Sequence, residues 1–181
     1  MKKIILLLLV AHFSVHAQDV YSSQTAKISF FSSTPVENID ANSGVVVTAI
    51  NTRTNVLFIK VPIQSFQFKK ALMQDHFNED YMESDKYPNA TFSGKVNETI
   101  DYMKDGINNV TLTGKLTIHN VTKDTTIAGT LTVNSGHILM HADFPVKLVD
   151  YNITVPKLVF EHIAQVIKVT YDADCVPYVK N

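Results

Sequence analysis

The residues best able to do chemistry are a few histidines with acidic neighbours, and the most prominent group is His137, His141 and Asp143. These residues share one parity of a segment that alternates in hydropathy, so they fall on one face of a predicted strand. Side chains four residues apart on a strand lie ~13 Å apart. Zinc ligands lie ~2 Å from the metal, so these residues cannot share one ion. We interpret them as a solvated face and predict no metal site.

Two other histidines have a structural interpretation beside a functional one. His76 and Glu79 lie one turn apart in a predicted helix and could touch a metal, but no second pair of ligands is evident. His76 also falls on the apolar face of that helix, which favours packing. His119 precedes a predicted tight turn. It either contacts the polar head of a ligand or holds the turn by hydrogen bonds, and the Asn and Thr residues around it favour the turn.

The sequence carries no recognisable catalytic motif. It has no nucleophile elbow, no phosphate-binding loop and no dinucleotide-binding glycine pattern. Cys175 is the only cysteine, so no internal disulfide can form. We interpret Cys175 as an incidental residue of a C-terminal tail, with a reactive or dimer-forming thiol as the alternative. We predict no catalytic residue and no cofactor.

The elements that must position any site are strands. From Val110 to Ile118, apolar residues or glycine hold every even position, and Thr or Lys holds every odd one. Residues 126–133 and 137–147 repeat this alternation. The pattern is typical of antiparallel sheets with one solvated face.

Further strands are predicted at 27–32, 44–51, 56–63, 90–96 and 166–172, with turns at 104–106 and 134–136. A helical pattern occupies 69–81, and 158–164 is a candidate second helical turn. About eight amphipathic strands leave no exposed edge when they close into a barrel. The sequence therefore predicts an all-β fold, a closed antiparallel barrel of about eight strands with one short helix packed at the barrel.

The N-terminus predicts export. Lys2 and Lys3 precede a short apolar run, and Ala17 is a small residue suited to cleavage, so 1–17 is predicted as a signal peptide and 18–181 as one domain. The apolar run is too short to span a membrane, which takes ~20 residues, so no stable membrane insertion is expected. Net charge is −1 and Arg53 is the only arginine, which argues against a nucleic-acid partner. We expect a periplasmic or secreted protein.

Three motifs resemble those of the YceI-like family. The first runs through Phe66-x-Phe68, Leu72-Met73, His76-Phe77, Tyr87-Pro88-x-Ala90-Thr91-Phe92 and Gly94. The second is the run from Gly114 to Lys123, and the third is Asp150-Tyr151-Asn152-Ile153. Asn120 and Asn152 stand where the family often has glycine. This departure is mild, because Asn tolerates the left-handed backbone region better than other residues with a side chain.

The resemblance implies a lipocalin-like barrel with an elongated apolar interior that binds a polyisoprenoid, such as an isoprenoid quinone or a related lipid, in the periplasm. Members of the family are often dimers, so a homodimer is possible. The sequence itself neither supports nor excludes one.

Small residues on the inward parity, Gly94, Gly114, Gly129 and Ala142, can leave an apolar channel inside the barrel. The alternative is that the glycines relieve strand crowding or mark barrel corners. We expect the channel, and predict that it is lined by Leu57, Ile59, Val61, Phe92, Leu112, Gly114, Leu116, Ile127, Leu131, Met140 and Phe144.

The function predicted from these observations is an exported carrier or reservoir of an apolar lipid, with no catalytic activity. One alternative is a partner-binding or stress-related structural barrel with a filled core and no ligand. Another is an enzyme that acts on an apolar substrate, since a site assembled in space leaves no motif.

Overall fold

The computed structural model describes residues 19–23, 25–156 and 161–179, so the predicted signal peptide at 1–17 lies outside the described residues. The strands are β1 (Val20–Ser23), β2 (Lys27–Ser33), β3 (Asn38–Ser43), β4 (Val47–Asn51), β5 (Val56–Pro62), β6 (Gln67–Phe68), β7 (Asn89–Val96), β8 (Gly106–Ile118), β9 (Val121–Asn134), β10 (His137–Lys147) and β11 (Val166–Pro177). The helical elements are η1 (Ile63–Ser65), α1 (Ala71–His76), η2 (Phe77–Tyr81) and η3 (Leu148–Tyr151).

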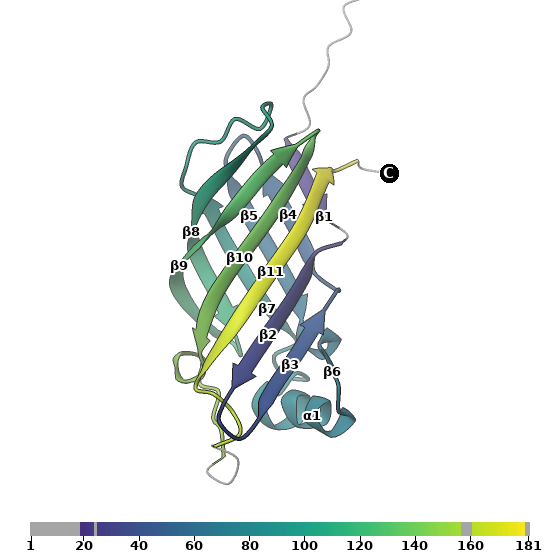
Figure 1. Cartoon of the computed structure of the whole chain (residues 1–181), viewed down its shortest axis with the longest axis vertical. Helices are drawn as coiled ribbons and strands as arrows, with labels where there is room; N and C mark the ends of the chain where they lie inside the picture. Colours follow the sequence, from purple (N-terminus) through teal and green to yellow (C-terminus); the bar gives the residue numbers. More distant parts are fainter. Residues whose placement is uncertain (1–18, 24, 157–160, 180–181) are drawn as a thin grey trace, which may run out of the picture.

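Within the described residues, eight strands close into a barrel in the order β1-β4-β5-β7-β8-β9-β10-β11 (Figure 1). The pairing of β1 with β11 closes the ring, and every neighbouring pair is antiparallel. The predicted fold class, an all-β closed antiparallel barrel of about eight strands with a short helix, is confirmed.

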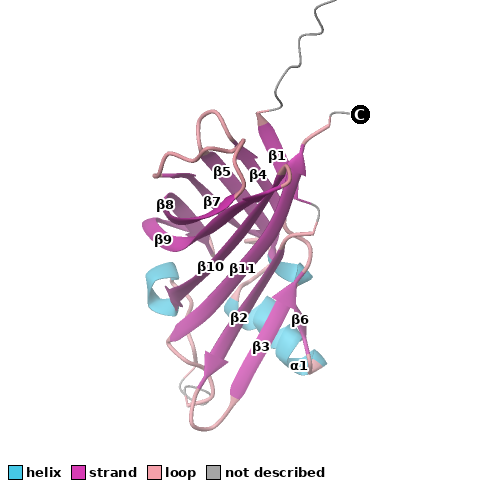
Figure 2. Ribbon diagram, turned by 45° about the horizontal axis from the view of Figure 1, so that its top comes forward, coloured by secondary structure: helices cyan, strands magenta, loops and turns pink. Residues whose placement is uncertain are grey.

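The sheet also extends beyond the barrel. One edge of β11 is divided, because it pairs with β1 at Tyr21↔Pro177 and with β2 from Lys27↔Asp172 to Phe31↔Lys168. Strand β2 then pairs with β3, and β3 pairs with β6. Figure 2 shows α1 beside β6 and β3. β1, β3 and β6 are strands that the sequence pattern did not predict.

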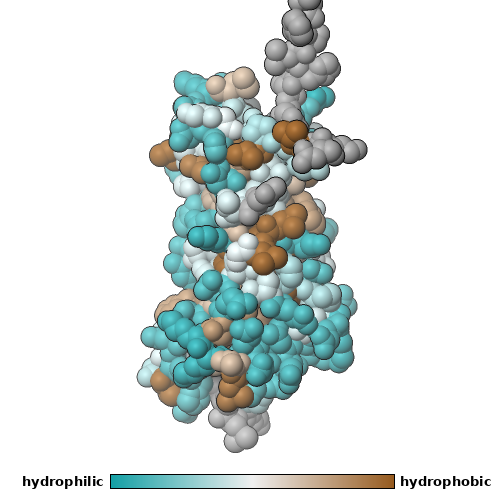
Figure 3. All heavy atoms as spheres, turned by 90° about the vertical axis from the view of Figure 1, so that its right-hand side faces the viewer, coloured by the Kyte–Doolittle hydropathy of each residue, from teal (hydrophilic) through white to brown (hydrophobic). Residues whose placement is uncertain are grey.

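The alternation of hydropathy places side chains as predicted. Val110, Leu112 and Leu116 of β8 are buried, and the same parity is buried in β9 and β10. The outer surface drawn in Figure 3 is largely hydrophilic, with hydrophobic residues in small separate groups. The barrel wall therefore has one dry and one wet face, as expected for this fold.

The helical segment predicted at 69–81 is observed as α1 followed by one π-helical turn, η2. Neither element has a fully buried side chain. The second predicted helical turn, 158–164, lies partly outside the described residues, and 161–164 form a turn rather than a helix.

Two tight hairpin turns use positive φ at both central residues. His119 and Asn120 have φ of 50° and 59° between β8 and β9, and Ser135 and Gly136 have φ of 50° and 82° between β9 and β10. This geometry matches the right-handed twist of the strands that the turns connect. Asn152 is also left-handed at φ 54°. Asn120 and Asn152 therefore adopt the left-handed conformation, which asparagine tolerates better than other residues with a side chain.

Gly94 and Gly114 lie opposite each other across β7 and β8. A Cβ added to Gly114 would lie 2.5 Å from the Gly94 Cα, and one added to Gly129 would lie 2.5 Å from the backbone oxygen of His141. The glycines thus allow neighbouring strands to approach closely, which is the alternative interpretation that the sequence left open.

Cys175 is not part of a tail. It lies within β11 opposite Ile138 and is completely buried. Burial raises the pKa of its thiol to about 12, and the nearby Asp174 carboxylate adds to the increase. The thiol is therefore protonated at neutral pH and inaccessible to reagents.

We expect Gly114→Ala to destabilise the barrel by about 1–3 kcal/mol, because the added methyl group overpacks the contact with β7. Gly106→Ala is the matched control, since a Cβ there meets nothing within 4 Å. Its unfolding free energy should change by less than about 0.5 kcal/mol. Urea unfolding of both variants measures the difference, and equal stabilities would contradict the close approach of the strands.

We expect Cys175 of the folded protein to react with a thiol reagent at about pH 8 at least a hundredfold more slowly than in the denatured chain, since only the thiolate reacts. A colorimetric thiol assay with and without denaturant measures both rates. Rapid labelling of the folded protein would show that β11 opens readily at this position.

Candidate ligand cavity

A cavity of about 350 Å³ lies inside the molecule, within the range of small-molecule sites. Its wall is formed by side chains of η1 and of β2, β3, β5, β6, β7, β8, β9, β10 and β11, and one side is covered by α1 and η2. Residues from the connection between η3 and β11 complete it. The cavity therefore sits where barrel, extended sheet and helical segment meet.

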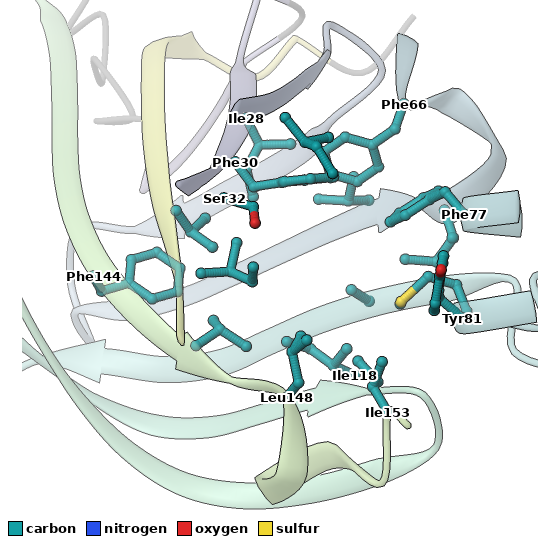
Figure 4. Close-up of a pocket in the computed structure, with 18 of the residues that line it drawn as sticks. Ile28, Phe30, Ser32, Phe66, Phe77, Tyr81, Ile118, Phe144, Leu148 and Ile153 are labelled. Atoms are coloured by element: carbon teal, nitrogen blue, oxygen red, sulfur yellow. The ribbon is translucent and has the colours of Figure 1, made fainter. Parts of the chain in front are cut away.

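The lining is almost entirely aliphatic and aromatic. Figure 4 shows Phe144 at the left of the cavity, Phe30 at the top, Phe77 at the right, and Leu148 with Ile153 at the bottom. Such a surface offers contact area to a ligand and few hydrogen bonds.

The cavity has a sharply defined inner end. On β10, Phe144 and Ala142 line it but Met140 does not, and on β11, Tyr171 lines it but Ala173 does not. Beyond this level the barrel is filled by fully buried side chains, namely Ile50, Leu57, Val96, Leu131 and Ile138.

Tyr171 marks that inner end. Its hydroxyl forms a buried hydrogen bond of 2.7 Å with the Thr48 hydroxyl, and burial raises the pKa of the Tyr171 phenol strongly. The phenol is thus neutral and satisfied by Thr48. It closes the cavity as part of the wall.

The residues predicted to line a channel divide into three groups. Seven line the cavity: Ile59, Val61, Phe92, Leu112, Leu116, Ile127 and Phe144. Leu57, Leu131 and Met140 are buried beyond the inner end. Gly114 does not line the cavity but faces Gly94. Strand parity predicts which face is inward, whereas the depth at which the barrel stops being filled depends on three-dimensional packing.

Sequence reasoning missed the contribution of β2 and of the helical segment. Ile28, Phe30 and Ser32 of β2 line the cavity, as do Phe77 and Tyr81 of η2. The alternation within 27–32 was a usable signal for the β2 residues. The predicted helix had an apolar face, but the sequence did not show that Met73, Phe77 and Tyr81 cover a cavity while Leu72 is 65% exposed.

An aromatic cluster holds the helical segment to the sheet. Phe30, Phe66, Phe68 and Phe77 make five ring contacts with centroids 5.0–5.7 Å apart. Pairs of this kind contribute about 0.5–1.5 kcal/mol each beyond area burial. Since Phe30 and Phe77 also line the cavity, the cluster fixes the wall of the site.

Polar groups gather at the end of the cavity opposite Tyr171, which we call the outer end. The Glu37 carboxylate accepts hydrogen bonds from Lys70 Nζ at 3.1 Å and His162 Nδ1 at 3.2 Å. Lys70 and then His162 lower the pKa of this carboxyl. The Ser32 hydroxyl accepts a hydrogen bond of 2.9 Å from the Ala164 N–H.

His119 has a structural role, as the favoured interpretation predicted, but its partners lie in other segments rather than in its own turn. Its ring lies 3.2 Å from the Tyr151 carbonyl oxygen and 3.1 Å from the Glu83 carboxylate, and Tyr87 packs edge-on at 4.6 Å. Hydrogen bonds from Lys86 and then from His119 lower the pKa of Glu83. His119 therefore ties three loops together outside the cavity.

The predicted solvated face on β10 carries separate pairs. His137 contacts Asp174, His141 contacts Asp172, and Asp143 contacts Lys168. Among the described residues, no three His, Cys, Asp or Glu side chains are grouped to hold a metal ion. His76 lines the cavity.

Solved structures similar to this one include proteins from three organisms. BcnA from Burkholderia cenocepacia is 16% identical, with a TM-score of 0.69 over 82% of this chain and 95% of that chain. A polyisoprenoid binding domain from Saccharophagus degradans is 13% identical, with a TM-score of 0.76 over 90% and 100%. The YCEI protein of Campylobacter jejuni is 16% identical, with a TM-score of 0.57 over 96% and 97%.

At these identities the structural likeness establishes the fold alone. No curated protein sequence is significantly similar to this chain. The family evidence is more extensive, because the YceI-like domain matches residues 11–175 of the 181 residues. Together with the barrel, this match shows that the chain belongs to the YceI-like family.

Proposed function

We propose that this protein binds an apolar lipid of the polyisoprenoid class inside its barrel and acts as an exported carrier or reservoir. The observation that carries the proposal is the cavity of about 350 Å³ with an almost wholly apolar lining. The alternative, a barrel with a filled core and no ligand, fits only the part of the barrel beyond Tyr171.

The energetics suit a branched hydrocarbon chain. Burial of apolar surface is worth about 0.8 kcal/mol per methylene-sized group, so several isoprene units outweigh the free energy lost on ordering the ligand. Aromatic and branched aliphatic walls offer dispersion contacts along the whole chain. No charged group is needed to recognise the chain itself.

Binding without catalysis agrees with the state of the inner polar groups. The Tyr171 hydroxyl, which lies deepest, is neutral and bonded to Thr48. Cys175, the one potential thiol nucleophile, lies beyond the inner end with a raised pKa. Neither group is poised to attack or to transfer a proton to a bound lipid.

The family and one structural relative support the ligand class. The Saccharophagus degradans structure is a polyisoprenoid binding domain. Because identity to it is only 13%, it supports the proposal by its fold and by its agreement with the cavity chemistry.

Export is proposed from the sequence of the first 17 residues, with its charged start and short apolar run. None of the helices in the described ranges is long and apolar enough to cross a membrane. A polyisoprenoid is nearly insoluble in water, so its movement through the periplasm requires a protein that encloses it.

Native mass spectrometry of the mature protein should detect a bound lipid, and organic extraction should release an isoprenoid. Lipid-free protein should then take up added isoprenoid with one-to-one stoichiometry. A protein that purifies empty and ignores added isoprenoids would contradict the proposal and favour the partner-binding alternative.

Ala142→Phe should lower isoprenoid affinity at least tenfold, because the new ring occupies space next to Phe144 inside the cavity. Ala128→Phe is the matched control, since Ala128 is exposed on the outer face of β9. Displacement of a fluorescent apolar probe measures both affinities. Equal binding by the two variants would place the ligand elsewhere.

A further inference from the structure

Three of the polar residues that line the cavity, Ser32, Glu37 and His162, lie at its outer end. Ile28, Phe30 and Ser32 face the cavity in order along β2, and Ile28 pairs with Tyr171 at the inner end. Ser32 therefore lies ~13 Å farther out than Ile28, at the strand rise of ~3.3 Å per residue. Glu37 follows in the connection to β3, and His162 faces the cavity from the turn before β11.

Ser32 presents an unused donor to the cavity. Its side chain is only 2% exposed, and Figure 4 shows its oxygen directed into the space between the apolar walls. The oxygen accepts a hydrogen bond from the Ala164 N–H. A hydroxyl also carries one hydrogen to donate, and the Ser32 hydroxyl donates it to no group among residues 19–23, 25–156 and 161–179. A buried donor without an acceptor is unfavourable, so an oxygen of a ligand is the natural partner.

Glu37 adds negative charge to the same wall. Its hydrogen bonds to Lys70 and His162 keep it ionised, and its side chain is 27% exposed against 68% for Lys70 and 44% for His162. The carboxylate is thus the least exposed of the three. It can accept a hydrogen bond from a hydroxyl group, and it repels an anion placed beside it.

Among the described residues, the two side chains at this end that could bind a diphosphate, Lys70 and His162, both contact Glu37. Bidentate recognition of phosphate is a property of arginine, and the only arginine of the chain, Arg53, pairs with Asp19 beside the β4–β5 turn. Lys70, the lysine in contact with the outer wall, is already bound to Glu37.

From this arrangement we infer that the outer end is a head-group site, in which Ser32 and Glu37 select a neutral oxygen-bearing head group, such as an alcohol, over a diphosphate on the same isoprenoid chain. The inference rests on the proposed function, because the chain must first occupy the cavity.

The test compares three probes that share one branched skeleton: geranylgeraniol, geranylgeranyl diphosphate and the hydrocarbon phytane. Each is titrated against a fluorescent apolar probe bound to the lipid-free mature protein. The alcohol should bind about tenfold more tightly than the diphosphate. Ser32→Ala should weaken alcohol binding about three- to tenfold and leave phytane binding unchanged. Glu37→Gln should reduce the ratio between the affinities for the alcohol and for the diphosphate.

Two control variants keep the test specific. Ser29→Ala removes a hydroxyl of the opposite parity on β2, and Asp40→Asn removes a carboxylate on the same hairpin that pairs with Lys69 outside the cavity. Neither should change the order of the three affinities. Phytane binding by Ser32→Ala also shows that the variant is folded.

The outcomes separate the two proposals. If phytane binds but the diphosphate matches or exceeds the alcohol, head-group selection is wrong while the carrier function stands. The same holds if Ser32→Ala weakens phytane as much as the alcohol, since that effect is packing alone. If none of the three displaces the probe, the carrier function itself fails, and the head-group site fails with it.

Discussion

The divided edge of β11 is the constraint on which the rest of the structure depends. Every buried backbone N–H and C=O of a strand needs a partner, and β11 finds its partners in β1 at one end and in β2 at the other. At the first end the sheet continues from β1 to β4, and this pairing closes the ring. At the second end the sheet continues from β2 to β3 and then to β6, which pairs with no further strand among the described residues. Near the β1 end of β11 the ring of paired strands is thus complete, whereas near the β2 end the sheet runs on past the ring.

This difference explains where the interior is filled and where it is hollow. In the half where the ring is complete, opposing strands bring Leu57, Leu131 and Ile138 close enough to fill the interior. In the other half the wall is completed by α1 and η2. An isolated helix this short is marginal in water, and neither element has a fully buried residue. The segment is held by Phe77 in the aromatic cluster and, next to α1, by the Lys70–Glu37 pair. Because α1 and η2 are attached mainly through the ring of Phe77, they cover the cavity without filling it.

The sequence predicted the barrel and the inward parity because period-two alternation is a local signal. It did not predict β3, whose sequence Asn38–Ser43 has only Ile39 as a large apolar residue. It also did not predict that β2 pairs with β11 outside the closed ring. It placed Ile59 and Leu57 together, although one lines the cavity and the other lies beyond it, because parity carries no information on depth. Gly114 was misplaced for a related reason: a missing side chain on the inward parity can create space, or can admit a neighbouring backbone. The contact with Gly94 shows that the second applies here.

The half of the barrel that holds the cavity is not packed as densely as the other half. The side chains around a space of about 350 Å³ make fewer contacts with one another than side chains in a filled core do. The chain has the means to fill such a space, since it packs the other half of the same barrel completely. It instead surrounds the space with large rigid rings such as Phe30, Phe77 and Phe144, which define a shape without closing it. A ligand in this space would contact these side chains, so the apolar lining of the cavity supplies the free energy of binding.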